Sequence, residues 1–270
     1  MRRLKVHIVV CVKQVPDYET PAPQLRVDDA TKTVSAPPGV APVVSQFDAI
    51  AVEAALRIKE AQGDGQVTIV TVGPDGAREV IKQALAMGAD EGILVNDPAL
   101  TGLDSFGTAH VLAAVVRKLG DVTLVFCGRQ ATDWDMGVVP AGIGELLGWP
   151  IVSIVKSVTA ENGKVQAERV LTDGFQKVES ELPAVVSVSN ELGEPRYPQL
   201  RQIMLAARKQ VTNYAAGDLG VDPDELSGAG LTLEKIYKPV YELQTEFVEA
   251  DSPQEAGAQL AVRLREAKII

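Results

Sequence analysis

A polar loop follows a strongly apolar segment near the middle of the chain. After Val122–Phe126 the sequence continues CGRQATDWDMG, from Cys127 to Gly137. In α/β proteins a nucleotide commonly binds where a buried strand gives way to such a loop and a new helix begins, because a glycine like Gly128 admits close approach and free amides can face a phosphate. Asp133 and Asp135 could accept hydrogen bonds from a ribose or adenine, or they could cap the helix. The alternative is an ordinary acidic capping turn, since any α/β domain contains such loops.

Little else in the sequence is suited to catalysis. There is no Walker A, G-x-S-x-G or H-E-x-x-H motif, and no complete G-x-G-x-x-G after the first strand. His7 and His110 are far apart, and Cys11 and Cys127 have no metal-binding spacing. We therefore expect no catalytic residue and no metal site, so any redox chemistry would come from a bound cofactor. Cysteine usage favours a reducing compartment, the cytoplasm, with the mitochondrial matrix as the alternative.

Composition excludes several classes of protein. The 270 residues are 46% hydrophobic but only 4% aromatic, which suits a parallel sheet covered by helices. The formal net charge of −10 argues against nucleic acids and anionic membranes as partners. No apolar run reaches the roughly 18 residues of a membrane span, and we interpret the apolar N-terminal run as a first strand and not as a signal peptide.

Apolar segments with strand and helix periodicity alternate through the first half of the chain. The predicted strands are Val6–Val12, Gln66–Val72, Gly92–Val95 and Val122–Phe126. The predicted helices are Ser45–Ala61, Ala77–Met87, Asp104–Leu119 and Met136–Leu147, with Ser45 as a candidate N-cap and Asp104 or Ser105 as another. A proline-rich excursion, residues 13–42, contains a hairpin at 25–34. This rhythm predicts an α/β fold with a three-layer, doubly wound, mostly parallel sheet of the adenine-nucleotide-binding, Rossmann-like kind.

The pattern changes after Pro150. Asn-Gly and Asp-Gly turns separate the next three predicted strands, 151–158, 164–171 and 175–180, which should extend the sheet in antiparallel fashion. A strand at 183–189 and a short helix at 198–207 follow. From residue 217 the α/β rhythm is lost, so we predict a nucleotide-binding domain over 1–216 and a linker with a helical arm over 217–270. The apolar stripe of that arm could dock on a partner or pack on its own domain.

Five segments, in order along nearly the whole chain, resemble the β (small) subunit of electron-transfer flavoproteins. They are VVCVKQVPDY (9–18), FDAIAVEAALRIKE (47–60), VGPDGAREVIKQALAMGADEGILV (72–95), GRQATDWD (128–135) and LPAVVSVSNELGEPRYPQLRQIM (182–204). The resemblance implies a heterodimer in which the alpha subunit carries a redox FAD. The beta subunit would support that FAD, bind AMP in its own core and dock its C-terminal arm on the alpha subunit. Electrons would pass between acyl-CoA dehydrogenase and a quinone-linked oxidoreductase.

The resemblance also implies site residues. The family's nucleotide pocket corresponds to Cys11, Ser45, Gln46, Phe47, Asp48, Val72, Gly128, Arg129, Gln130, Ala131, Thr132, Asp133, Asp135, Gly137, Val138 and Val139. Tyr18 matches the tyrosine beside the alpha-subunit flavin. Leu192 matches an exposed leucine that anchors in a dehydrogenase pocket, within a partner-binding loop that includes Glu194, Pro195, Arg196 and Tyr197. Arg196 and Tyr197 are expected to hold the shape of that loop.

Some positions depart from the family pattern. Val138 and Val139 lack the usual polar side chains, and Pro140 lacks a backbone donor. Asp48 is similar to relatives that bifurcate electrons, whereas Trp134 replaces the glycine common among them. We expect AMP in this pocket; the alternative is a bifurcating complex with a second FAD that reacts with NADH. A stand-alone, stress-type ATP-binding protein is a third hypothesis, and the direction of electron flow stays open.

Overall fold

The computed structural model describes residues 6–226, 230–240 and 245–270. It divides into two compact units, Met1–Ile236 and Tyr237–Ile270. The second unit contains a single described helix, α7 (Pro253–Glu266), whose hydroxyl cap Ser252 accepts a hydrogen bond from the Glu255 amide. No described helix combines the length and apolar character that crossing a membrane requires.

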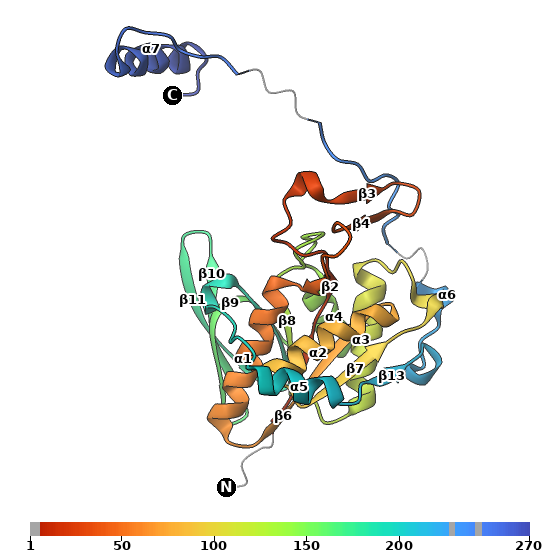
Figure 1. Ribbon diagram of the computed structural model, residues 1–270. Coiled ribbons are helices and arrows are strands. Elements are labelled where there is room, and N and C mark those ends of the chain that lie inside the picture. Colours follow the sequence, from red (N-terminus) through yellow and green to blue (C-terminus); the bar gives the residue numbers. More distant parts are fainter. Residues whose placement is uncertain (1–5, 227–229, 241–244) are drawn as a thin grey trace. The chain divides into compact units, whose positions relative to one another are not determined.

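A nine-stranded sheet forms the centre of the first unit (Figure 1). Its order is β11-β10-β9-β12-β8-β1-β6-β7-β13, and all neighbours are parallel except β9-β10 and β10-β11. The strands are β1 (Val6–Cys11), β6 (Gly65–Val72), β7 (Glu91–Val95), β8 (Leu124–Gly128), β9 (Ile151–Glu161), β10 (Lys164–Leu171), β11 (Gly174–Glu181), β12 (Ala184–Val188) and β13 (Thr212–Tyr214). The predicted parallel sheet with an antiparallel extension is confirmed.

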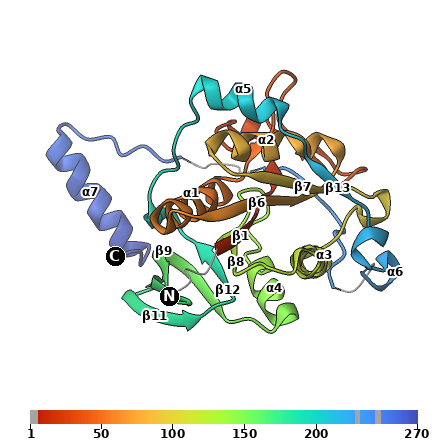
Figure 2. The ribbon, with the colours of Figure 1, turned by 90° about the horizontal axis from the view of Figure 1, so that it is seen from below.

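Helices cover both faces of the sheet, as Figure 2 shows in a view along its strands. Helices α1 (Gln46–Gln62) and α2 (Arg78–Met87) lie on one face, and α3 (Ser105–Leu119) and α4 (Val139–Leu147) lie on the other. Helix α5 (Leu200–Arg208) packs on the outside of α2, and a short α6 (Pro223–Leu226) packs near α3. This is the three-layer α/β architecture that the alternation of strands and helices predicts.

Strand β1 separates two apolar cores. All six of its residues are buried, as expected for a central parallel strand. Ile8 and Val10 face the core beneath α1 and α2, whereas Val9 and Cys11 face the core beneath α3 and α4. Side chains of a strand alternate between its faces, so one short apolar run supplies both cores.

The chain reverses its direction of travel across the sheet beside β1. From β1 it proceeds through α1, β6 and α2 to β7 on one side, and α3 then carries it back to β8 on the other side. The loops that leave the carboxyl ends of β1 and β8 therefore diverge to opposite faces. Open α/β sheets bind their ligands at such a switch point, here the region between the carboxyl ends of β1 and β8, which we call the crevice.

The excursion between β1 and α1 forms two small ribbons. β2 (Gln14–Val15) pairs with β5 (Val43–Val44), and β3 (Arg26–Asp28) pairs with β4 (Thr33–Ser35) in the predicted hairpin. The hairpin holds a segment from far along the chain, because the Asp29 carboxylate accepts a hydrogen bond from the Ile236 amide at 2.9 Å. The first unit thus continues twenty residues past the predicted boundary at 216.

Two predicted element boundaries shift where the nucleotide loop begins and ends. Strand β8 runs on to Gly128, two residues further than predicted. The following helix begins at Val139 and not at Met136, because Asp135 and Gly137 have left-handed φ values of 51° and 66° that interrupt a right-handed helix. The loop between them is correspondingly longer, and it frames the crevice.

Candidate functional site

The crevice is closed at its base by the buried carboxylate of Asp48, in the first turn of α1. One oxygen accepts a hydrogen bond from the Lys13 amide at 2.8 Å, and the other accepts from the Gly128 amide at 3.0 Å. Lys13 follows β1 and Gly128 ends β8. A single side chain therefore joins the carboxyl ends of the two strands that border the switch point.

Burial makes this carboxyl group a weak acid. Desolvation raises the pKa of Asp48 from 3.8 to about 7, although the hydrogen bonds from Lys13 and Gly128 and the Lys13 charge oppose the rise. The negative charge of Asp133 adds to it. The group consequently changes its protonation near neutral pH while it holds both backbone amides.

Gly128 is required by this packing. A β-carbon placed on it would lie 2.5 Å from an Asp48 carboxylate oxygen and 2.7 Å from the Phe47 β-carbon. In the direction of that β-carbon the space is filled by the first turn of α1, so the glycine lets α1 approach β8. The approach of a ligand to the Gly128 backbone stays a prediction.

Two further contacts connect the loops above Asp48. The Lys13 ammonium lies 2.8 Å from the Asp133 carboxylate, which joins the β1 loop to the β8 loop. Ser45, which is fully buried, donates its amide to the Lys13 carbonyl at 3.0 Å and accepts at its hydroxyl from the Thr132 amide at 3.3 Å. The loop of residues 129–137 is thus fixed to both β1 and α1.

The expected helix caps take other roles. The Ser45 hydroxyl makes no capping bond to α1, since its acceptor is used by Thr132. Neither Asp133 nor Asp135 caps α4: Asp133 pairs with Lys13, and the Asp135 carboxylate accepts from the Gln130 side chain at 2.8 Å. Both acidic residues shape the loop, so the capping interpretation of this stretch is wrong.

Two hydrogen-bonding features of the loop are unused. The Thr132 hydroxyl is buried and has no hydrogen-bond partner among the described residues. Among the described residues, no side chain caps the first turn of α4. Buried polar groups nearly always have partners, and an uncapped helix N-terminus attracts anions. The crevice can therefore donate hydrogen bonds to an anionic or hydroxyl-bearing ligand.

The remaining predicted pocket residues surround these donors at the same sheet edge. Cys11 ends β1 and is buried, and Val72 ends β6 on the far side of β1 from β8. The Arg129 guanidinium lies 5.5 Å from the centre of the Phe47 ring. Gln46, Ala131, Gly137, Val138 and Val139 complete the loop and helix starts. Lys13 is the contributor that sequence reasoning missed, although a cation directly after a buried strand was a usable signal.

The predicted partner-binding loop lies apart from these residues, along the outer side of α1. Arg196 donates to Glu53 at 2.7 Å and to Glu60 at 2.5 Å. Burial raises the pKa of Glu53, but hydrogen bonds from Arg196 and Arg57 outweigh it and bring the value below the ordinary one. Arg196 thus holds the shape of the loop, whereas Tyr197 is 91% exposed.

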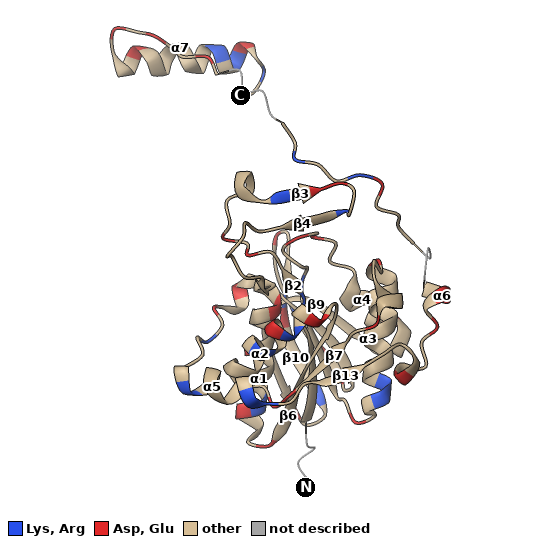
Figure 3. Ribbon diagram, turned by 45° about the vertical axis from the view of Figure 1, so that its right-hand side comes forward, with Lys and Arg blue, Asp and Glu red and all other residues tan. Residues whose placement is uncertain are grey.

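The leucine of that loop is half-buried and not exposed. Leu192 packs against the main core from a 3₁₀ turn, Asn190–Leu192, and its carbonyl accepts from Arg57 at 3.4 Å. The exposed apolar side chains lie further along, on α5, where Leu200 is 75% and Met204 is 58% exposed. In Figure 3, α5 carries basic residues and no acidic ones, which agrees with its sequence LRQIMLAAR.

Tyr18 lies in a turn after β2 and is about half exposed. Its pKa is raised by partial burial and by the nearby carboxylates of Glu19, Asp17 and Glu194. Glu194 belongs to the partner-binding loop, so this loop and Tyr18 lie within electrostatic reach of each other. An aromatic ring with an apolar face and a polar tip is exposed here.

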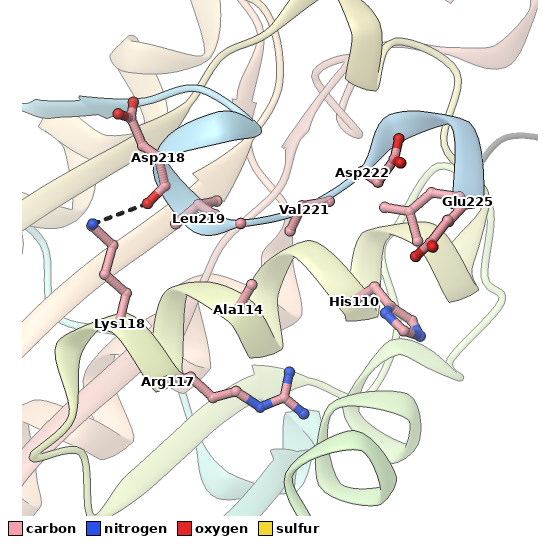
Figure 4. A pocket seen from close by; sticks show the side chains of 11 residues that line it. His110, Ala114, Arg117, Lys118, Asp218, Leu219, Val221, Asp222 and Glu225 are labelled. Atoms are coloured by element: carbon pink, nitrogen blue, oxygen red, sulfur yellow. Dashed lines mark hydrogen bonds between the residues drawn. The ribbon is translucent and has the colours of Figure 1, made fainter.

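A cavity of about 600 Å³ lies elsewhere, between α3 and the segment that includes α6 (Figure 4). Its titratable lining residues are His110, Arg117, Lys118, Asp218, Asp222 and Glu225. None of its lining residues belongs to the crevice, so the two are separate. Among the described residues, no group of three or more His, Cys, Asp or Glu side chains could hold a metal ion.

We expect Asp48→Asn to flatten the pH dependence of stability. Between about pH 4 and pH 7 the folded protein binds a proton at Asp48 that the unfolded chain does not, so the free energy of unfolding falls as pH rises through this window. The slope is at most about 1.4 kcal/mol per pH unit. Urea unfolding at pH 5, 6, 7 and 8 should show the wild-type advantage over Asp48→Asn shrinking with pH. Parallel pH profiles would contradict this. The control is Asp135→Asn, an exposed aspartate of the loop between β8 and α4, which should keep the wild-type slope.

Comparison with known proteins identifies the family. The sequence model of the electron transfer flavoprotein domain matches residues 35–219. The chain is 39% identical to the electron transfer flavoprotein subunit beta of Thermoanaerobacterium thermosaccharolyticum, over 83% of this chain and 84% of that protein. It is 36% identical to the protein of the same name from Mycobacterium tuberculosis, over 98% and 99%.

A third relative has a more specific name. The chain is 33% identical to the caffeyl-CoA reductase-Etf complex subunit CarD of Acetobacterium woodii, over 98% of this chain and all of that protein. These matches extend along nearly the whole chain and agree with the Rossmann-like fold. The chain belongs to the electron transfer flavoprotein beta subunit family.

Proposed function

We propose that this chain is the beta subunit of a heterodimeric electron transfer flavoprotein that holds AMP in the crevice between β1 and β8. In this role it supports the FAD of an alpha subunit and passes electrons onward without a catalytic residue of its own. The observation that supports the proposal is the sheet switch point between β1 and β8, where Asp48 holds both strand ends and the buried Thr132 hydroxyl has no partner among the described residues. A cytoplasmic setting suits two cysteines that form no disulfide.

The donor set suits an adenine nucleotide. The Thr132 hydroxyl and the first amides of α4 can donate to phosphate or ribose oxygens, and the Arg129 guanidinium can approach a phosphate. Cys11 and Val72 offer small apolar walls at the same edge for a base. A nucleotide bound here would tie the β1 loop, the β8 loop and α4 together, which is a structural role.

The composition of the loop favours AMP over a second FAD. Val138 and Val139 bring no polar side chain to the start of α4, and Pro140 brings no amide. A site with so few donors suits one phosphate better than the pyrophosphate of FAD. The similarity to CarD and the presence of Asp48 support the second candidate, a bifurcating complex in which a second FAD reacts with NADH. A stand-alone ATP-binding protein is disfavoured by the family match.

Partner contacts are proposed for the C-terminal arm, Tyr18, the loop of Leu192 to Tyr197 and α5. The arm after residue 217, including α7, would dock on the alpha subunit, and the exposed ring of Tyr18 would cover its flavin. Acyl-CoA dehydrogenase would dock on the loop of Leu192 to Tyr197 together with the exposed face of α5. A quinone-linked oxidoreductase would take the electrons.

The nucleotide proposal is tested by the composition of the purified heterodimer. The chain is co-expressed with its alpha subunit and denatured, and the released nucleotides are separated and quantified. We expect about one FAD and about one AMP per heterodimer. The alpha subunit purified without this chain should release no AMP. About two FADs and no AMP would overturn the AMP assignment and establish the bifurcating alternative.

The docking proposal predicts that Leu200→Ser slows electron delivery from acyl-CoA dehydrogenase. Leu200 is exposed in the folded chain, so the change removes a partner contact without opening the core. We expect the KM for the dehydrogenase to rise about tenfold, or about 1.4 kcal/mol, with FAD content unchanged. Leu171→Ser, an exposed leucine of β10, is the matched control. Equal KM values for the two variants would refute docking on α5.

Leu192→Ala is also expected to slow electron delivery from acyl-CoA dehydrogenase, through a lost partner contact and through lower stability of the chain. Because Leu192 packs on the main core, its truncation also lowers the free energy of unfolding. Urea unfolding alongside the kinetics separates the two effects. A variant with wild-type stability and wild-type transfer rates would remove Leu192 from both roles.

A further inference from the structure

The only two cysteines of the chain lie side by side beneath the crevice. In the parallel pairing of β1 and β8, Val10 lies opposite Phe126, and Cys11 and Cys127 are the next residues of the two strands. Both thiols face the core beneath α3 and α4. Far apart in sequence, they become neighbours through the register of the central strands.

Their geometry is close to that of a disulfide. Neighbouring strands of a sheet are about 4.8 Å apart, and disulfides join α-carbons about 4.4–6.8 Å apart. The pKa of Cys127 is raised first by its interaction with the neighbouring Cys11 thiol and then by burial, which agrees with two thiols that lie side by side. Closing a bond between the sulfurs therefore needs rotation of two side chains and a small local approach of the strand ends.

The position of the pair makes that approach feasible. Each cysteine occupies the last or next-to-last position of its strand, where the sheet gives way to the loops that begin at Val12 and Arg129. The amides that Asp48 holds belong to Lys13 and Gly128, two residues after Cys11 and one after Cys127. A covalent bond between the sulfurs would join the same two strand ends that the carboxylate joins.

We propose that Cys11 and Cys127 are a redox-active dithiol that hydrogen peroxide oxidises to an interstrand disulfide. The first attack falls to Cys11, because the Cys127 thiol holds its proton tightly. The Cys11 sulfur attacks one peroxide oxygen, the O–O bond breaks, and water leaves with Cys11 as a sulfenic acid. The Cys127 sulfur then attacks the Cys11 sulfur, the S–O bond breaks, and a second water leaves as the S–S bond forms. Two thiols are oxidised and one peroxide is reduced to two waters.

Hydrogen peroxide treatment of the reduced native heterodimer tests the proposal. The quenched protein is alkylated without reduction, and the chain is weighed intact and after trypsin digestion. We expect its mass to be about 2 Da below that of the reduced, unalkylated chain. Peptides 6–13 and 119–129 should stay joined until a reductant is added. The matched variant Cys127→Ser should give no such loss and should instead form a sulfenic acid on Cys11 that dimedone traps.

Four results would overturn the proposal, and the first three concern the folded protein. They are a wild-type chain that stays reduced at peroxide levels that oxidise free cysteine, a chain whose cysteines go only to sulfinic or sulfonic acid, and cross-links only between chains. A disulfide that appears only after urea unfolding would do the same, because the proposal requires the pairing that the folded sheet imposes. Circular dichroism of the oxidised protein shows whether the fold is kept.

Discussion

A buried carboxylate joins two strands at the centre of the sheet. Asp48 accepts one hydrogen bond from the amide of Lys13, just after β1, and one from the amide of Gly128, which ends β8. These strands are neighbours in the sheet but are far apart in sequence. Burial of a charge is costly, and here two backbone donors and the Lys13 ammonium offset part of that cost. The spacing of the crevice loops depends on this arrangement, as does the requirement for glycine at position 128.

The fold follows from local patterns in the sequence, because the helices and strands have their own periodicities and several helices have an aspartate or glycine at a boundary, such as Asp104 and Gly120 around α3. Asp104 shows this well, since it caps α3 through the Gly107 amide as expected. The site was less predictable. Lys13 pairs with Asp133, and the Ser45 hydroxyl accepts from the Thr132 amide instead of capping its own helix. Both contacts join segments more than thirty residues apart, so no local pattern predicts them. A sequence motif identifies such a loop but not which of its groups remain free.

The same limit explains Leu192. Its neighbours in sequence suggest an exposed anchor, but the burial of a side chain is decided by the packing of η4 (Asn190–Leu192) against α1 and β9. Arg196 fixes this loop through the buried Glu53, so the exposed apolar surface begins beyond it, at Tyr197 and along α5. In the proposed function, the nucleotide would bind between β1 and β8, and the redox partner would dock on the separate basic and apolar face of α5.

The central claim is that the free donors between β1 and β8 bind an adenine nucleotide. Calorimetric titration of AMP into the nucleotide-stripped heterodimer tests it most directly, with the wild type compared with Thr132→Val and Thr132→Ser. If the buried Thr132 hydroxyl donates to the nucleotide, valine should weaken AMP binding about tenfold and serine should restore most of it. Equal affinity for AMP in all three proteins, or no binding to the wild type, would contradict the account.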